Sequence, residues 1–210
     1  MKQNTIKNIC EIDGIGIHSG LNTKIVLNPS NVDTGIIFRF FNKDDNNNVI
    51  ESSILPATFD HVVSTKLGTT ISNGELTVLT IEHLMASLWA CNIENVIIDI
   101  INTKQEIPIL DGGSKSFIEK IKNIGVKELN LERNYIKVLK TIEVSSDDSF
   151  IRIEPSDDFS IDMTVEFSYG NIGKQHYFFN GKQDEFIKNI SKARTFCNKE
   201  EIEFMKKNGL

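Results

Sequence analysis

The chain has 210 residues, of which 40% are hydrophobic and 25% charged. A chain of this length can bury a core without disulfides, and these fractions exclude a disordered, collagen-like or coiled-coil protein. The net charge of −6 argues against a nucleic-acid partner, because phosphate binding needs an excess of Lys and Arg on one face.

The cysteines and the apolar runs indicate the compartment. Cys10, Cys91 and Cys197 are odd in number and form no C-x-x-C pair, so neither a disulfide framework nor a zinc ribbon is expected. No run of about 18 apolar residues occurs, and the first ten residues lack the apolar centre of a signal peptide. We therefore expect a cytoplasmic protein without a membrane span.

The first part of the chain alternates β-type runs with turns. The runs at 5–12, 14–20, 23–27 and 36–41 predict antiparallel strands, and the polar segment 42–48 predicts a loop. Asn73-Gly74 predicts a hairpin between 66–72 and 75–79. An apolar stripe then predicts a helix from Ile81 to Cys91, with Thr80 as its N-cap.

The remaining elements indicate an α+β fold. A β-branched run at 95–101 predicts a buried strand, and 114–124 predicts a second amphipathic helix. After a charged connector at 128–134, a second series of elements follows. Its expected strands and helices are 135–144, 150–154, 161–167, 176–179, 184–191 and 199–208. The order of elements suggests two similarly built domains, the second of them incomplete.

One glycine-rich pattern is weak evidence for a phosphate site. Residues 14–20 read G-x-G-x-x-x-G and precede a β-type run, whereas a dinucleotide loop needs a helix N-terminus. We interpret this segment as a glycine-rich turn. No P-loop sequence, G-x-S-x-G elbow or neighbouring Cys and His occurs, and Asp111, Ser114 and Asp184 are interpreted as turn and cap residues.

Glu82-His83 is the pair that could carry chemistry. A neutral imidazole ligand and a carboxylate base for bound water stand side by side at a predicted helix start. Taken alone, a histidine there is more often a surface or hydrogen-bonding residue than a metal ligand. The other histidines, His18, His61 and His176, are isolated in sequence, so spacing alone assembles no catalytic zinc site of three ligands.

Four segments together resemble the UDP-3-O-acyl-N-acetylglucosamine deacetylases, the zinc amidases of lipid A biosynthesis. They are 13–20 (DGIGIHSG), 79–88 (LTIEHLMASL), 106–114 (EIPILDGGS) and 191–196 (SKARTF). The resemblance implies two related α+β domains, each a small, mostly antiparallel sheet layered on helices. The domains are then expected at 1–127 and 135–210, joined by the connector 128–134. The reaction implied is hydrolysis of the N-acetyl group of UDP-3-O-[(3R)-hydroxyacyl]-N-acetylglucosamine to the free amine and acetate.

The resemblance also implies roles for individual residues. His83 would be a Zn²⁺ ligand and Glu82 the general base, while Thr195 would hydrogen-bond the oxyanion or substrate and Phe196 would stack near the sugar. The remaining metal ligands would lie beyond Leu210, so this chain is expected to be a shortened version with weak zinc binding and little activity. If it nevertheless held zinc, His18 or His61 would be a substitute ligand.

Partners and alternatives follow from the same resemblance. The expected partner is a nucleotide-sugar lipid substrate, with no nucleic acid, at most transient contact with a membrane surface, and a monomeric protein. The alternative is a non-catalytic relative that keeps the fold and binds a nucleotide sugar or a partner protein. The presence of both Glu82-His83 and the 194–196 motif favours the enzyme.

Overall fold

The computed structural model describes residues 1–43, 49–101, 105–167, 172–197 and 201–202. Its first half is built around a five-stranded sheet with the order β2-β3-β9-β4-β5. The strands are β2 (Cys10–Ile15), β3 (Asn22–Pro29), β4 (Ile36–Lys43), β5 (Val49–Pro56) and β9 (Val96–Ile100). Neighbours are antiparallel except β4 and β9, which run parallel.

Two helices cover one face of this sheet. They are α1 (Glu82–Ala90) and α2 (Lys115–Ile124), and α1 follows a small sheet of three short strands. These strands, β6 (Val62–Ser64), β7 (Thr70–Ser72) and β8 (Thr77–Val78), come after a 3₁₀ turn at Phe59–His61. The turn at Asn73-Gly74 joins β7 to β8 as predicted, with Gly74 at a positive φ of 95°.

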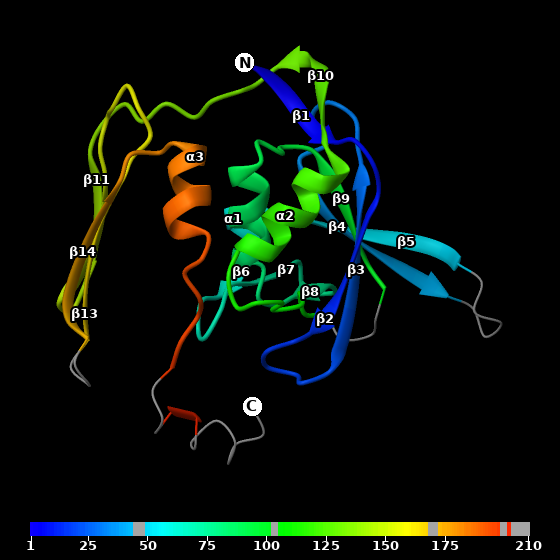
Figure 1. Ribbon diagram of the computed structural model, residues 1–210, viewed down its shortest axis with the longest axis horizontal. Helices are drawn as coiled ribbons and strands as arrows, with labels where there is room; N and C mark the ends of the chain where they lie inside the picture. The colour runs from blue at the N-terminus through cyan, green and yellow to red at the C-terminus, as the bar shows by residue number, and fades with distance from the viewer. Residues whose placement is uncertain (44–48, 102–104, 168–171, 198–200, 203–210) are drawn as a thin grey trace.

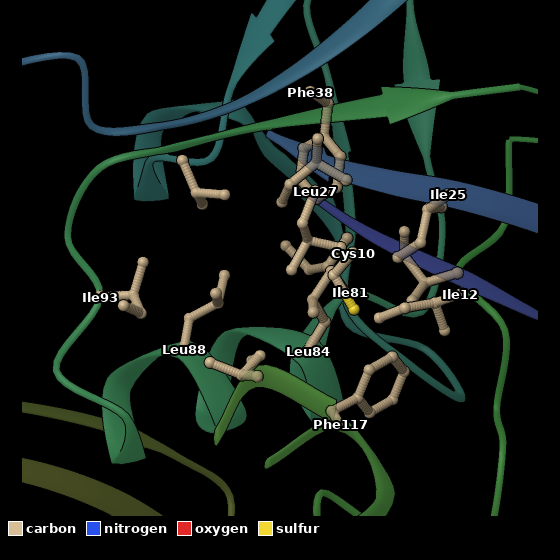
Figure 2. Packing of buried hydrophobic residues seen from close by; sticks show 14 of the residues in the cluster. Cys10, Ile12, Ile25, Leu27, Phe38, Ile81, Leu84, Leu88, Ile93 and Phe117 are labelled. Atoms are coloured by element: carbon tan, nitrogen blue, oxygen red, sulfur yellow. The ribbon is translucent and has the colours of Figure 1, made fainter. Parts of the chain in front are cut away.

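The core lies between α1, α2 and the five-stranded sheet. Alternate residues of the strands face the helices, and the apolar stripe of α1 faces the strands (Figure 2). Phe38, Leu84, Leu88 and Phe117 are fully buried there. Because the sheet alternates with period two and the helix with period 3.6, the two patterns meet in one continuous apolar layer.

Residues after the first half form two separate hairpins and a short helical segment. The hairpins are β11 (Ile142–Ser146) with β12 (Ser149–Ile153), and β13 (Ile161–Phe167) with β14 (Gly173–Phe179). The helical segment is α3 (Gln183–Glu185), continued by a π turn at Phe186–Ile190. In Figure 1 this segment lies beside α1, with the hairpins on its far side.

An aromatic cluster joins the hairpin region to α1. Trp89 on α1 contacts the rings of Phe159, Phe179 and Phe186, with centroids 5.5–6.0 Å apart. Edge contacts of this kind add to the apolar burial of the rings. The described elements thus confirm an α+β fold.

Some element predictions were wrong in detail. The expected strand at 5–12 is two strands, β1 (Lys2–Ile6) and β2, and the expected strand at 14–20 ends at Ile15, after which the chain turns. The expected connector 128–134 lies mainly in β10 (Val126–Glu132), which pairs with β1. Residues 44–48 and most of the predicted helix 199–208 are outside the described residues. The domain boundaries at 127 and 135 stay a prediction.

Candidate active site

Glu82 and His83 occupy the first turn of α1, as predicted. The Oε2 atom of Glu82 accepts a hydrogen bond from the backbone N–H of Thr69 at 2.9 Å. The Oε1 atom lies 3.9 Å from Nε2 of His83. The Glu82 side chain is 35% exposed and that of His83 19% exposed, so both can reach solvent or a ligand. One carboxylate oxygen is therefore anchored while the other faces the imidazole.

Thr80 is not the N-cap of α1, contrary to the prediction. Ile81 occupies that position, and no side-chain cap bond is formed there. Thr80 instead has a positive φ of 60°, which is costly for a β-branched residue, and it is almost fully buried. Its hydroxyl donates to Oε1 of Glu106 at 3.4 Å. A strained backbone position thus directly precedes the Glu82-His83 turn.

Glu106 holds the glycine-rich segment beside this turn. Its Oε1 accepts the backbone N–H of His18 at 2.8 Å, and its Oε2 accepts the backbone N–H of Ser19 at 3.0 Å. The carboxylate comes so close to Gly16 that a Cβ at that position would overlap it. Only glycine fits there, so the segment closes into a turn around the carboxylate.

His18 and Glu82 face a common space beside Gly68. A Cβ built on Gly68 would lie 3.6 Å from Nε2 of His18 and 3.3 Å from Oε1 of Glu82. The hydroxyl of Thr80 would be 3.7 Å from the same point. Because Gly68 has no side chain, polar groups from two other segments of the chain border the space beside it.

The turn before α2 binds the 191–196 segment. Gly112 O accepts the N–H of Thr195 at 2.8 Å, and Ser191 O accepts the N–H of Lys115 at 3.0 Å. A Cβ on Gly113 would lie 2.6 Å from the carbonyl oxygen of Ala193. The Thr195 side chain is exposed, and Phe196, 59% exposed, packs edge-on against Phe167. The two predicted substrate-binding residues therefore project from a docked strip of backbone.

The other candidates lie in ordinary structural settings. Nδ1 of His61 is 2.8 Å from the Thr58 hydroxyl. Nε2 of His176 is 2.6 Å from Oδ1 of Asp162. Ser114 stands at the N-cap of α2 without a side-chain cap bond, and Asp111 is exposed in the preceding turn.

Glu106 is the site residue that the reading of individual residues missed. It appeared only as the first letter of the third resembling segment. The available signal was a lone acid at the head of the apolar run 107–110, because the buried start of this run, Ile107 and Pro108, forces a neighbouring carboxylate to find donors. Nothing in the sequence indicates that those donors belong to residues 18, 19 and 80.

Within the described residues, no cluster of three or more His, Cys, Asp or Glu is placed to hold a metal ion. His83, Glu82 and His18 approach one another from two segments, but they do not form such a cluster. Among the described helices, none is long and apolar enough to cross a membrane.

Comparisons with known proteins identify the family of the chain. The family described as "LpxC: UDP-3-O-acyl N-acetylglycosamine deacetylase" matches residues 3–210. A UDP-3-O-acyl-N-acetylglucosamine deacetylase of Nautilia profundicola is 37% identical over 210 residues, covering all of this chain and 68% of the relative. Deacetylases of the same name from Francisella tularensis subspecies tularensis and holarctica are each 32% identical over 212 residues, covering all of this chain and 72% of each relative. All four resembling segments lie within the matched range, and the chain belongs to the LpxC family of UDP-3-O-acyl N-acetylglycosamine deacetylases.

Proposed function

We propose that this chain supplies the Glu82-His83 part of a deacetylase site that hydrolyses the N-acetyl group of UDP-3-O-[(3R)-hydroxyacyl]-N-acetylglucosamine. The substrate class, a nucleotide-sugar lipid, follows from the family and from the name shared by its relatives. The products are the free amine and acetate. The step belongs to lipid A biosynthesis.

One observation supports the proposal most directly: the four resembling segments contact one another although they are far apart in sequence. Segments 13–20 and 106–114 meet through Glu106 and through Ile109 N–H donating to Ile15 O at 2.9 Å. Segments 79–88 and 106–114 meet where Ile107 N–H donates to Leu79 O at 3.1 Å. Segment 191–196 adds the contact of Thr195 with Gly112 described above. An arrangement needed only for folding would not require an exposed acid and imidazole at its centre.

Glu82 is the group that we propose as general base. Its Oε2 is fixed by Thr69, so Oε1 can accept a proton from a water molecule in the space beside Gly68. His83 lies on the same side, 3.9 Å away, with its Nε2 directed toward that carboxylate. Thr195 and Phe196 are proposed to contact the oxyanion or substrate and the sugar.

Zn²⁺ is proposed as the cofactor, with His83 as one ligand. When bound, zinc lowers the pKa of its water to about 7 and polarises the acetyl carbonyl. The described residues do not complete a site of three ligands. The remaining ligands are expected beyond Leu210. Cytoplasmic location is part of the same proposal and is supported by three free cysteines. A monomeric state is proposed with it.

Zinc titration of the 210-residue chain and acetate release from the acylated substrate test the proposal. We expect weak zinc binding that His83→Ala reduces further and Glu82→Ala retains, with little turnover. His176→Ala is the matched control, because the His176 ring bonds Asp162 in the separate β13-β14 hairpin. Stoichiometric, tight zinc with rapid acetate release would contradict the incomplete site. Unchanged zinc binding in His83→Ala would contradict the ligand assignment.

A longer version of the protein with the further ligands tests the base directly. Glu82→Ala should then abolish turnover while zinc is kept. Equal activity in Glu82→Ala would rule out Glu82 as the base, and substrate binding without turnover in the unsubstituted protein would favour the non-catalytic relative.

A further inference from the structure

Glu106 is a buried carboxylate that accepts hydrogen bonds from three donors. It is 3% exposed, and its two oxygens accept from the backbone N–H groups of His18 and Ser19 and from the Thr80 hydroxyl. These donors come from two other segments of the chain. A single buried carboxylate therefore ties the turn 16–20 to the residue that precedes the Glu82-His83 turn.

Its charge is balanced by hydrogen bonds alone. Among the described residues, no Lys, Arg or His forms an ion pair with Glu106. A buried carboxylate without a counter-ion is unfavourable unless several donors satisfy it. A neutral or apolar residue would fill the same volume at lower cost if only packing were required. The particular capacity of a carboxylate is to accept from two successive N–H groups at once.

Those two N–H groups set the position of the His18 ring. The turn is closed by Gly16 N–H donating to Leu21 O and by Gly20 N–H donating to Gly16 O. The side chain of Glu106 binds this closed turn, while the backbone of Glu106 forms a β-bridge with Leu79. In this position Nε2 of His18 borders the same space beside Gly68 as Oε1 of Glu82, at 3.6 Å and 3.3 Å from a Cβ built on Gly68.

We propose that Glu106 is a positioning residue. Its carboxylate fixes the 16–20 turn, so that the imidazole of His18 stays at the space beside Gly68 that Oε1 of Glu82 also borders. Its bearing on deacetylation rests on the proposed function. The positioning itself does not depend on zinc or on turnover.

The test measures how fast diethyl pyrocarbonate modifies each histidine in the 210-residue chain, residue by residue, by mass spectrometry. In Glu106→Gln the side-chain NH₂ would meet one of the two backbone N–H groups, so the turn loses an acceptor and is released. We expect the rate at His18 to rise several-fold, while the rates at His61 and His176 stay unchanged. An unchanged His18 rate in the folded variant would overturn the proposal.

Asn95→Ser is the matched control for lost stability. Asn95 is also buried and also links distant segments. Its Oδ1 accepts from Gly35 N–H, and its Nδ2 donates to Gln3 Oε1. Within the described part of the chain, the Asn95 side chain forms no hydrogen bond with the 16–20 turn. A His18 rate that rises equally in Asn95→Ser would show a general loosening of the fold and would also overturn the proposal.

Gly16→Ala provides a second route if Glu106→Gln folds poorly. The added Cβ would overlap both Oε2 of Glu106 and Oγ of Ser19, so the His18 rate should rise as in Glu106→Gln. In the double variant the two changes should not fully add, because both disturb the contact between Glu106 and the turn. Full additivity would contradict the proposal.

The outcome separates this role from the proposed function. Glu82→Ala and His83→Ala leave every contact of Glu106 in place, so neither variant should release the 16–20 turn. If those variants refute the deacetylase assignment while Glu106→Gln still releases His18, the positioning stands and the function fails. If only the Glu106 result fails, the function stands.

Discussion

Gly113→Ala should detach the 191–196 segment from the turn that precedes α2. The added Cβ would lie 2.6 Å from Ala193 O and 3.1 Å from Ser191 O, and both are backbone atoms that cannot rotate away. Relief requires the strip to move, which breaks the bonds from Thr195 N–H and Lys115 N–H. Two backbone hydrogen bonds at about 1 kcal/mol each give a local loss of about 2 kcal/mol. A loss of this size raises the equilibrium constant for local opening of the segment roughly thirtyfold.

Native-state hydrogen exchange at the amide of Thr195 measures this opening directly. The matched control is Gly68→Ala, whose added Cβ would meet only side-chain atoms, the nearest at 3.3 Å. We expect Thr195 protection to fall in Gly113→Ala and to stay unchanged in Gly68→Ala. Undiminished protection in Gly113→Ala would refute the inference that this close approach holds the segment in place.

Three further changes test the core, the sheet and the thiols. Leu84→Ala, at a fully buried position, should cost about 2–5 kcal/mol in urea unfolding, and a cost below about 1 kcal/mol would contradict its burial. Asp99→Ala leaves the half-buried Arg39 without its partner at 2.6 Å and should cost about 2 kcal/mol by the same measurement. Burial raises the pKa of the Cys91 thiol from 9.0 to about 11, so its contribution to stability is full below pH 9 and is lost as pH rises toward 11. Iodoacetamide at pH 8 should accordingly label Cys197 in the native chain and spare Cys91.

The helices could be predicted closely because their signals are local. Ile81, Leu84 and Leu88 have helical spacing, and all three are buried. Helix α1 is one residue shorter at each end than predicted, so Ile81 is its N-cap. The wrong N-cap shows the limit of that signal. Thr80 has the side chain that an N-cap needs, but its hydroxyl bonds Glu106 instead, and a contact across 26 residues leaves no local trace.

Strand β10 illustrates the same limit on a larger scale. Its sequence, with three exposed charged residues, resembles a connector because the strand is at an edge and buries little. Its pairing partner is β1, at the other end of the first half. Sequence could therefore single out the candidate pair Glu82-His83, whose members are adjacent. It could not identify Glu106, whose role exists only once three segments have assembled.

The pairing of β1 with β10 also has a consequence for biosynthesis. Lys2 lies opposite Glu132 and Ile6 opposite Val126, so β1 leaves the ribosome long before its partner strand is made. At about 5–20 residues per second, Val126 is added roughly 6–25 s after β1. During that interval β1 is an unpaired edge strand with Ile6 exposed. Chaperone binding to nascent chains should therefore fall once β10 has emerged from the exit tunnel.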